Sequence, residues 1–361
     1  MSFESTKREW SELYSLFRLL ADAVVYAGTP EVKRNENSCL PIALIQRNEH
    51  NGLRRYIVEG ENIHLVGEEM DKIVLRTEFD KYARMILSIM KSTTEESVEC
   101  PDELEAFLNE IAIFDIEANT DDRTDFYVAF GYADAPLIGF NVRSRIGRMF
   151  PLLDGGRSAN LKYELSGLKF ATPMIDKVNA LKTINEVADR MLLIERLGGI
   201  LRYSDVADKV FRCNLSMIDL HFPRLLAEML KIMHLDGITK VSELTERMKE
   251  INPLKIREEL ITKHHFYEYK IKQFLLTLAL GMRPAKLFTG IDSAIAGHLL
   301  VEGSGDILCY QKSDKETFED YLFRNTRLDK GSTEKDKYGY LERENGVHYF
   351  KLNLKIVLTK R

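Results

Sequence analysis

Two short strand-like runs, at residues 125–130 and 137–144, constrain the fold of this chain more than any other feature. Successive side chains of a β-strand point to opposite faces of the sheet. Asn141 and Arg143 therefore share one face while their neighbours point into a core, and Asp125 lies opposite the apolar residues of the first run. If the runs are neighbours in one sheet, these side chains can hold a divalent ion beside a phosphodiester, as metal-dependent nucleases do.

The length of the chain predicts more than one core. At 361 residues it exceeds the size at which single cores usually stop growing, so we expect two or three subdomains. No apolar run reaches the roughly 20 residues of a membrane helix, and the N-terminal residues lack the apolar segment of a signal peptide. We therefore expect a cytoplasmic protein without membrane contact.

Known cofactor motifs are missing from the sequence. It contains no P-loop, no Rossmann glycine pattern and no zinc spacing of the H-E-x-x-H or C-x-x-C type. His264 and His265 are adjacent, so they project in different directions from a helix and suit one metal poorly. We expect no nucleotide cofactor. The four cysteines are expected to be reduced and structural.

The charge pattern leaves nucleic-acid binding open. A net charge of -5 does not favour a nonspecific binder, which usually carries a basic surplus. A clamp-shaped protein can still concentrate positive charge on its inner wall. A local excess of this kind lies at Arg143, Arg145, Arg148, Arg157 and Lys162, although a solvated loop explains the same charges.

Periodicity divides the chain into four regions. Residues 1–92 alternate between helical and β-type patterns and predict an N-terminal α+β subdomain. Residues 93–175 hold a helix, the two strands above and a further strand at 161–165, which together predict an α/β core with a mixed sheet. Residues 176–282 are mainly helical, and residues 283–361 are rich in strands.

Short motifs in a fixed order extend over nearly the whole chain. They are LAD at 20–22, PI at 41–42, GFNVRSRIG at 139–147, PLLDGGRSANLKYEL at 151–165, DYLFRNT at 320–326 and KLNL at 351–354. In order and content they resemble the HpaII family of type II restriction endonucleases.

The resemblance implies a fold and an activity. The expected fold class is α/β, with a mixed-sheet PD-(D/E)XK nuclease core, an N-terminal α+β segment and a helical region. The implied reaction is Mg²⁺-dependent hydrolysis of both strands of duplex DNA at a short palindrome, CCGG by resemblance. Asp125 takes the place of the metal-binding aspartate, Asn141 the middle polar position and Arg143 the lysine position.

Asn141 and Arg143 depart from the family's pattern. Arginine stays charged at any accessible pH, so it can clamp phosphate oxygens but cannot act as a general base. Asn141 can ligate Mg²⁺ through its carbonyl oxygen but adds no negative charge, so metal affinity should fall unless another carboxylate helps. The candidates are Glu164 on the expected next strand, Glu110 on the preceding helix, and the pair Asp121 and Asp122. Each of them can equally be a solvated or turn residue.

Several residues are candidates for contacting DNA. Phosphate contact is the expected role of the cations that follow the catalytic strand, because most protein–DNA hydrogen bonds fix register without reading sequence. These residues are Arg145, Arg148, Arg157 and Lys162, and weaker candidates are Ser332 and Thr333 in the C-terminal motif region. Residues 1–92 and 283–361 are the regions expected to add further DNA contacts. A palindrome is most simply cut by a symmetric homodimer, although a monomer that nicks each strand in turn stays open.

Three functions remain open from the sequence. The first is an active restriction endonuclease that uses Asp125, Asn141 or Glu164 for Mg²⁺ and Arg143 for charge stabilisation. The second is a catalytically impaired nuclease fold that binds DNA sequence-specifically. The third is a helical interaction module whose charges form a solvated surface. Of these, the active enzyme is favoured.

Overall fold

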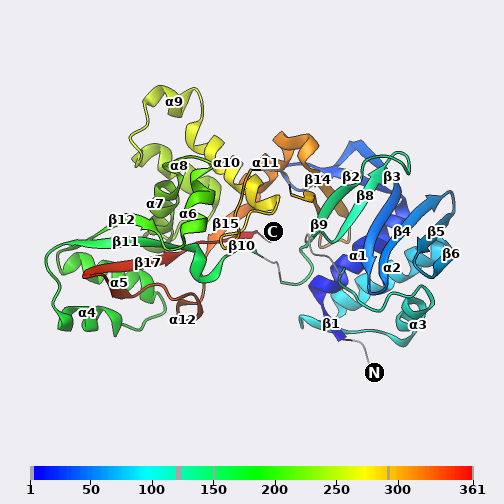
Figure 1. Ribbon diagram of the computed structural model, residues 1–361, viewed down its shortest axis with the longest axis horizontal. Coiled ribbons are helices and arrows are strands. Elements are labelled where there is room, and N and C mark those ends of the chain that lie inside the picture. Colours follow the sequence, from blue (N-terminus) through cyan, green and yellow to red (C-terminus); the bar gives the residue numbers. More distant parts are fainter. Residues whose placement is uncertain (1–3, 119–123, 149–150, 291–292, 360–361) are drawn as a thin grey trace. The chain divides into compact units, whose positions relative to one another are not determined.

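The structure is a computed structural model, and the residues it describes are 4–118, 124–148, 151–290 and 293–359. They form two compact units (Figure 1). Unit 1 consists of residues 1–150 and 292–321, and unit 2 consists of residues 151–291 and 322–359. The expected regions 93–175 and 283–361 therefore each contribute to both units.

Unit 1 combines a large sheet with two long helices. Its elements are β1 (Glu4–Thr6), α1 (Lys7–Asp22), β2 (Val24–Gly28), β3 (Arg34–Glu49), β4 (Gly52–Glu59), β5 (Asn62–Gly67), β6 (Met70–Leu75), α2 (Arg76–Ser92), β7 (Ser97–Glu99), α3 (Asp102–Glu110), β8 (Phe126–Phe130), β9 (Ile138–Ser144), β13 (Ile295–Val301), β14 (Ile307–Gln311) and the short 3-10 turn η2 (Lys312–Asp314). Helix α11 (Lys315–Asn325) spans the boundary between the units.

The large sheet of unit 1 is mixed, as the sequence predicts. Among the described residues its strand order is β2-β14-β13-β9-β8-β3-β4-β5-β6, with parallel pairs β13–β9 and β14–β2. Strand β3 is long enough to pair with β2 through its first half and with β8 through its second half. The strands from β2 round to β3 thereby close on themselves. Strand β9 lies between β8 and β13 in this ring.

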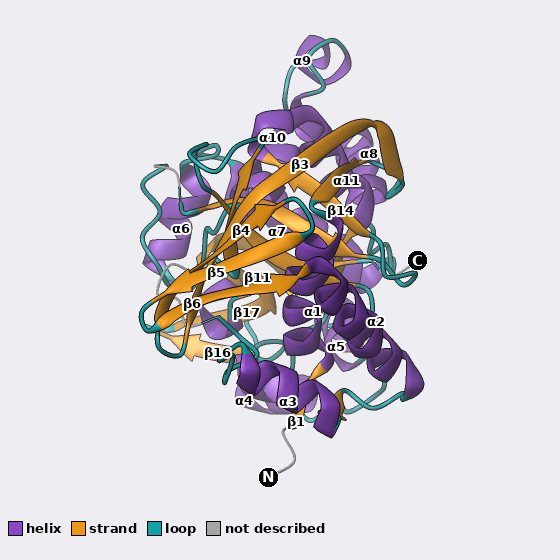
Figure 2. Cartoon of the chain, turned by 90° about the vertical axis from the view of Figure 1, so that its right-hand side faces the viewer, coloured by secondary structure: helices purple, strands orange, loops and turns teal. Residues whose placement is uncertain are grey.

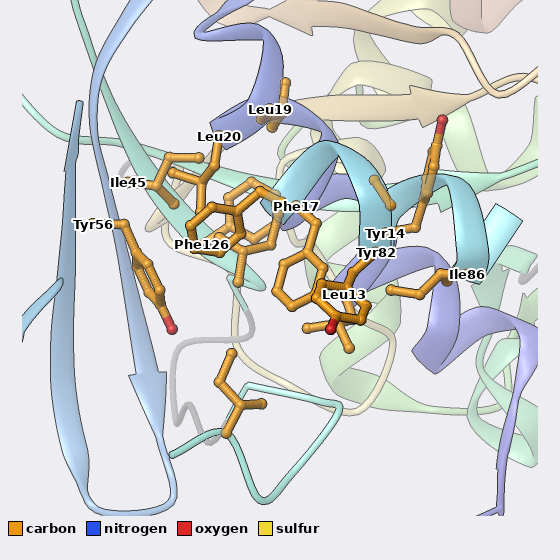
Figure 3. Close-up of a cluster of buried hydrophobic side chains, with 14 of the residues drawn as sticks. Leu13, Tyr14, Phe17, Leu19, Leu20, Ile45, Tyr56, Tyr82, Ile86 and Phe126 are labelled. Atoms are coloured by element: carbon orange, nitrogen blue, oxygen red, sulfur yellow. The ribbon is translucent and has the colours of Figure 1, made fainter. Parts of the chain in front are cut away.

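Helix α1 begins and packs as its sequence dictates. Thr6 and Glu9 form a capping box: the Thr6 hydroxyl accepts from the backbone N–H of Glu9, and the Glu9 carboxylate accepts from the backbone N–H of Thr6 at 2.6 Å. The apolar stripe of Trp10, Leu13 and Phe17 is buried. Figure 3 shows Phe17 and Leu13 meeting side chains from the sheet and from α2, and Figure 2 shows α1 and α2 side by side. This packing fixes α1 against β9.

Unit 2 contains two small sheets and most of the helices. Its elements are β10 (Pro151–Asp154), η1 (Gly156–Ala159), β11 (Asn160–Gly167), α4 (Thr172–Asn179), α5 (Glu186–Arg196), β12 (Gly199–Val206), α6 (Lys209–Ser216), α7 (Phe222–Leu235), α8 (Val241–Ile251), α9 (Glu258–Thr262), α10 (Phe266–Ala279), β15 (Thr326–Asp329), α12 (Thr333–Asp336), β16 (Leu341–Glu344), β17 (Val347–Asn353) and β18 (Lys355–Leu358). The sheets have the orders β12-β11-β17-β16 and β10-β18-β15. Residues 176–282 contain helices α5 to α10, the end of α4 and the strand β12.

One sequence prediction about the sheet is wrong. The strand expected at 161–165 forms, as β11, but it pairs with β12 and β17 in unit 2 and not with β9. The neighbour of β9 is the parallel strand β13, which comes from much later in the chain. Parallel neighbours need a long crossover connection, so adjacency in sequence does not reveal them.

In the part of the chain that is described, no helix is long and apolar enough to cross a membrane.

Candidate active site

Asp125 lies immediately before β8 and beside the central residues of β9. Its backbone N–H donates to the carbonyl of Phe140 at 2.9 Å, and its Oδ2 accepts from the backbone N–H of Val142 at 2.6 Å. These two bonds lock the carboxylate beside β9. Burial raises the pKa of Asp125 to about 6, although the Val142 N–H and the charge of Arg143 oppose the rise.

Arg143 and Asn141 share one face of β9, as strand alternation predicts. Their neighbours Phe140 and Val142 pack toward the core that α1 and α2 cover. Burial lowers the pKa of Arg143, and the charge of Asp125 counteracts this effect. The Nε atom of Arg143 is buried and has no hydrogen-bond partner among the described residues. Asp125 and Arg143 each affect the pKa of the other, so the two groups lie within electrostatic range of each other.

A second carboxylate reaches this place from α1. Glu12 is buried, and its Oε1 accepts from Nη2 of Arg47 at 3.0 Å and from the backbone N–H of Ala118 at 2.7 Å. Neither bond occupies Oε2. Burial, with the charge of Asp125 adding to it, raises the pKa of Glu12 to about 8. The charge of Asp125 acts on Glu12 in this way only if the two carboxyl groups lie near each other.

Arg47 holds this acidic cluster in place. It is buried at the end of β3, and besides Glu12 it donates to Glu49 at 2.6 Å and to the carbonyl of Ile116. Glu49 in turn accepts from the hydroxyl of Tyr56 at 2.5 Å. One guanidinium is thus shared by two buried carboxylates and a carbonyl, with Asp125 near enough to feel its charge.

The donor set suits a divalent cation. Glu12, Glu49 and Asp125 bring three carboxyl groups close to Arg47, and a bound divalent ion would favour the ionised form of Glu12, whose pKa burial raises. Carboxylate and amide oxygens are the ligands that Mg²⁺ prefers. No group of three or more His, Cys, Asp or Glu arranged to hold a metal occurs among the described residues. An ion bound by Asp125 and Glu12 would therefore complete its shell with neutral oxygens such as that of Asn141, or with water.

Three other residues predicted for this site lie in unit 1, and their surroundings differ from one another. Arg145 forms a largely buried ion pair with Glu302, at 3.0 Å. Arg148 is exposed and lines the same small pocket as Arg143. Glu110 is exposed and paired with Lys72 at 2.7 Å, so it belongs to another part of the surface. The candidates Asp121 and Asp122 lie outside the described residues.

The remaining predicted residues belong to unit 2. Glu164 is on β11, opposite Tyr349 of β17 in the antiparallel register, and is not part of the cluster in unit 1. Lys162 of the same strand pairs with Glu344, and Nε of Arg157 donates to the carbonyl of Lys335 at 3.2 Å. Ser332 and Thr333 lie at the start of α12: Ser332 caps the helix, and the Thr333 hydroxyl donates to Glu186 at 2.9 Å.

Sequence reasoning missed Glu12 and Arg47. Both are charged residues inside apolar stretches, Glu12 between Trp10 and Leu13 on α1 and Arg47 just after the run 41–45 on β3. A charged residue on the buried side of an amphipathic helix or in a central strand needs a partner. The need of these two buried charges for a partner is therefore the sequence signal that could have identified Glu12 and Arg47 as site residues.

Comparison with known proteins identifies the family of this chain. The family model described as HpaII restriction endonuclease matches residues 6–358. The type II restriction enzyme HpaII of Haemophilus parainfluenzae is 30% identical over 359 residues, which cover 98% of each chain. No solved structure matches. The chain belongs to the HpaII restriction endonuclease family and is a type II, site-specific deoxyribonuclease.

Proposed function

We propose that this enzyme is a PD-(D/E)XK nuclease that uses Mg²⁺ to hydrolyse both strands of duplex DNA at a short palindrome, CCGG by its relationship to HpaII. Restriction endonucleases generally use a divalent metal ion. The observation that carries the proposal is the convergence of Asp125, Glu12 and Arg143, from β8, α1 and β9, on one place in unit 1.

The metal ligands in this proposal are Asp125, Glu12 and the carbonyl oxygen of Asn141. Glu12 takes the part for which Glu164 was the leading candidate from the sequence. A bound Mg²⁺ would lower the pKa of an attacking water and offset the charge of the phosphate. Arg47 positions Glu12 by its hydrogen bond and keeps a compensating positive charge beside the two acids.

The chain's own residues would act on the phosphodiester as follows. Asp125, fixed by the Val142 N–H, would hold the ion beside the phosphodiester. The water oxygen forms a bond to phosphorus, the bond from phosphorus to the leaving sugar oxygen breaks, and the water proton passes to solvent while the leaving oxygen gains one. Arg143 donates N–H groups to the non-bridging oxygens, where negative charge grows in the transition state. It acts as an electrostatic stabiliser and not as a base.

Further DNA contacts are proposed in both units. Arg148 is exposed near Arg143 and is placed for a flanking phosphate. The guanidinium of Arg145 forms an ion pair with Glu302. We propose that this ion pair stabilises β9 and that Arg145 also contacts a phosphate. In unit 2 the proposed contacts are Arg157, Lys162, Ser332 and Thr333. We also propose a homodimer, because two-fold symmetry of the protein would match that of a palindrome.

The test is cleavage of plasmid DNA in Mg²⁺ by the wild type and by Asp125→Ala. We expect discrete fragments ending at CCGG from the wild type, none from the variant, and similar binding of both to a CCGG duplex in a gel-shift assay. Equal cutting by Asp125→Ala would remove this residue from the site. A wild-type protein that protects CCGG without cutting it would support the alternative, an impaired nuclease that binds DNA, which the Asn141 and Arg143 replacements bring into consideration.

A further inference from the structure

A small pocket in unit 1 lies between the start of α1 and the end of β9. Four of its lining residues are cationic, namely Lys7, Arg8, Arg143 and Arg148, and none of its described lining residues is acidic. The ammonium of Lys7 donates to the carbonyl of Thr93 at 2.6 Å, so one of its hydrogen bonds already goes to the protein backbone. A pocket with this lining favours an anion.

Arg8 and Arg143 come from different elements but act on the same carboxylate. Burial raises the pKa of Asp125, and the charges of Arg143 and Arg8 both oppose that rise. The charge of Arg8 also adds to the effect of burial in lowering the pKa of Arg143. Two guanidinium groups that repel each other across one pocket are stabilised when an anion binds between them.

The position of Arg8 on α1 connects the pocket to the metal ligands. Arg8 and Glu12 are four residues apart, so they lie on one face of the helix. Glu12 faces Asp125, and Arg8 follows one turn nearer the N-terminus, at the pocket. Arg8 pairs with Glu117 at 3.8 Å, and both side chains are about half exposed. Such a half-exposed ion pair contributes little to stability.

Arg143 has an unmet hydrogen-bonding requirement at the same place. Its Nε–H is buried and has no partner among the described residues. A buried donor without an acceptor is unfavourable, and an oxyanion in the pocket would supply the acceptor. Phosphate is the oxyanion that a guanidinium pair recognises best, because each planar fork can donate two parallel N–H bonds.

We propose that Arg8 is a catalytic residue that binds the scissile phosphate together with Arg143. The inference rests on the proposed function of the Asp125 site. Two guanidinium groups then replace the single lysine of the family's pattern, and both donate to the non-bridging oxygens as their charge increases in the transition state. Helix α1 therefore supplies a metal ligand, Glu12, and a phosphate ligand, Arg8, from consecutive turns.

The test compares Arg8→Gln with Arg84→Gln as a matched control. Arg84 is an exposed arginine on α2, paired with Asp80 at 2.8 Å, and the control variant should cut like the wild type. For Arg8→Gln we expect kcat on a CCGG duplex to fall about 100- to 1,000-fold with a smaller change in KM. Arg8→Lys should recover part of the rate, because it restores the charge without the planar fork. Inorganic phosphate, titrated calorimetrically into metal-free enzyme, should bind the wild type more tightly than Arg8→Gln.

The outcomes separate this inference from the proposed function. Fluorescence of Trp10, buried two residues along α1, reports whether each variant is folded. Cutting by Arg8→Gln within twofold of the wild type, or a raised KM with unchanged kcat, would overturn the role of Arg8 while leaving the Asp125 result intact. Normal cutting by Asp125→Ala would refute the proposed function, and the phosphate titration would still decide whether the arginine pocket binds an oxyanion.

Discussion

Replacing Arg47 with methionine should weaken unit 1 more than any surface change of the same size. The guanidinium of Arg47 is buried and donates to Glu12, Glu49 and the Ile116 carbonyl. Burial alone would lower the pKa of Arg47, but the charges of Glu49 and Glu12 raise it above its usual value, so the group is charged at every working pH. Methionine fills similar space but leaves two carboxylates and a carbonyl without their donor.

The expected cost follows from the number of groups left unpaired. Removing one partner of a buried ion pair typically costs about 3–5 kcal/mol, because the remaining charge stays buried. We expect Arg47→Met to lower the free energy of unfolding of unit 1 by an amount in that range. In a Glu12→Gln background the same change should cost less, with a coupling of about 0.5–3 kcal/mol between the two positions.

The single tryptophan of the chain makes the measurement specific to unit 1. Trp10 is buried in α1, and its Nε1 donates to the carbonyl of Val98 at 3.0 Å. Its fluorescence during urea unfolding therefore follows this unit. Arg84→Met is the control, since an exposed ion pair contributes at most about 1 kcal/mol. A loss of less than 1 kcal/mol for Arg47→Met would contradict the view that this residue organises the acidic cluster.

Two further predictions concern other parts of the chain. Burial, with a smaller effect of the charge of Lys330, lowers the pKa of His234 to about 4, so the unfolded chain binds this proton first as the pH falls. The stability that neutral His234 provides is complete above about pH 6.5 and is lost toward pH 4, by about 3 kcal/mol in all. His234→Phe should remove this part of the acid sensitivity, as measured by urea unfolding followed by circular dichroism. An unchanged pH profile of the variant's stability would contradict the prediction. Gly147 has φ +90°, and a Cβ there would lie 2.7 Å from the Cβ of Lys7. Gly147→Ala should cost about 1–3 kcal/mol of stability by Trp10 fluorescence, whereas wild-type stability would show that the loop moves away freely.

The local geometry of the candidate site can be predicted from the sequence. Strand alternation placed Asn141 and Arg143 on one face, and the structure has them there on β9, next to Asp125. The amphipathic stripe of Trp10, Leu13 and Phe17 likewise predicted α1. These features depend on periods of two and of 3.6 residues, which a short window of sequence contains.

The long-range parts were not readable. Glu12 comes within electrostatic range of Asp125 only because α1 packs against β9, and no local pattern encodes that proximity. The strand at 161–165 was assigned to the wrong sheet because sequential strands are neighbours only about two-thirds of the time. The parallel partner of β9 arrives after the whole helical region of unit 2. Glu164 is a candidate from the sequence for the same reason, since it is close in sequence to the two strands, whereas Glu12 is far from them.

The most direct test of the site is a binding titration of the DNA-free enzyme with Mn²⁺ as a paramagnetic probe for a divalent ion, with free Mn²⁺ measured by electron paramagnetic resonance. We expect Asp125→Asn and Glu12→Gln each to weaken binding at least about tenfold, because each removes one charged ligand. Glu110→Gln, which removes an exposed carboxylate on α3, should leave binding unchanged. Binding of Mn²⁺ by both site variants at wild-type affinity would contradict the assignment of these two carboxylates as a metal site.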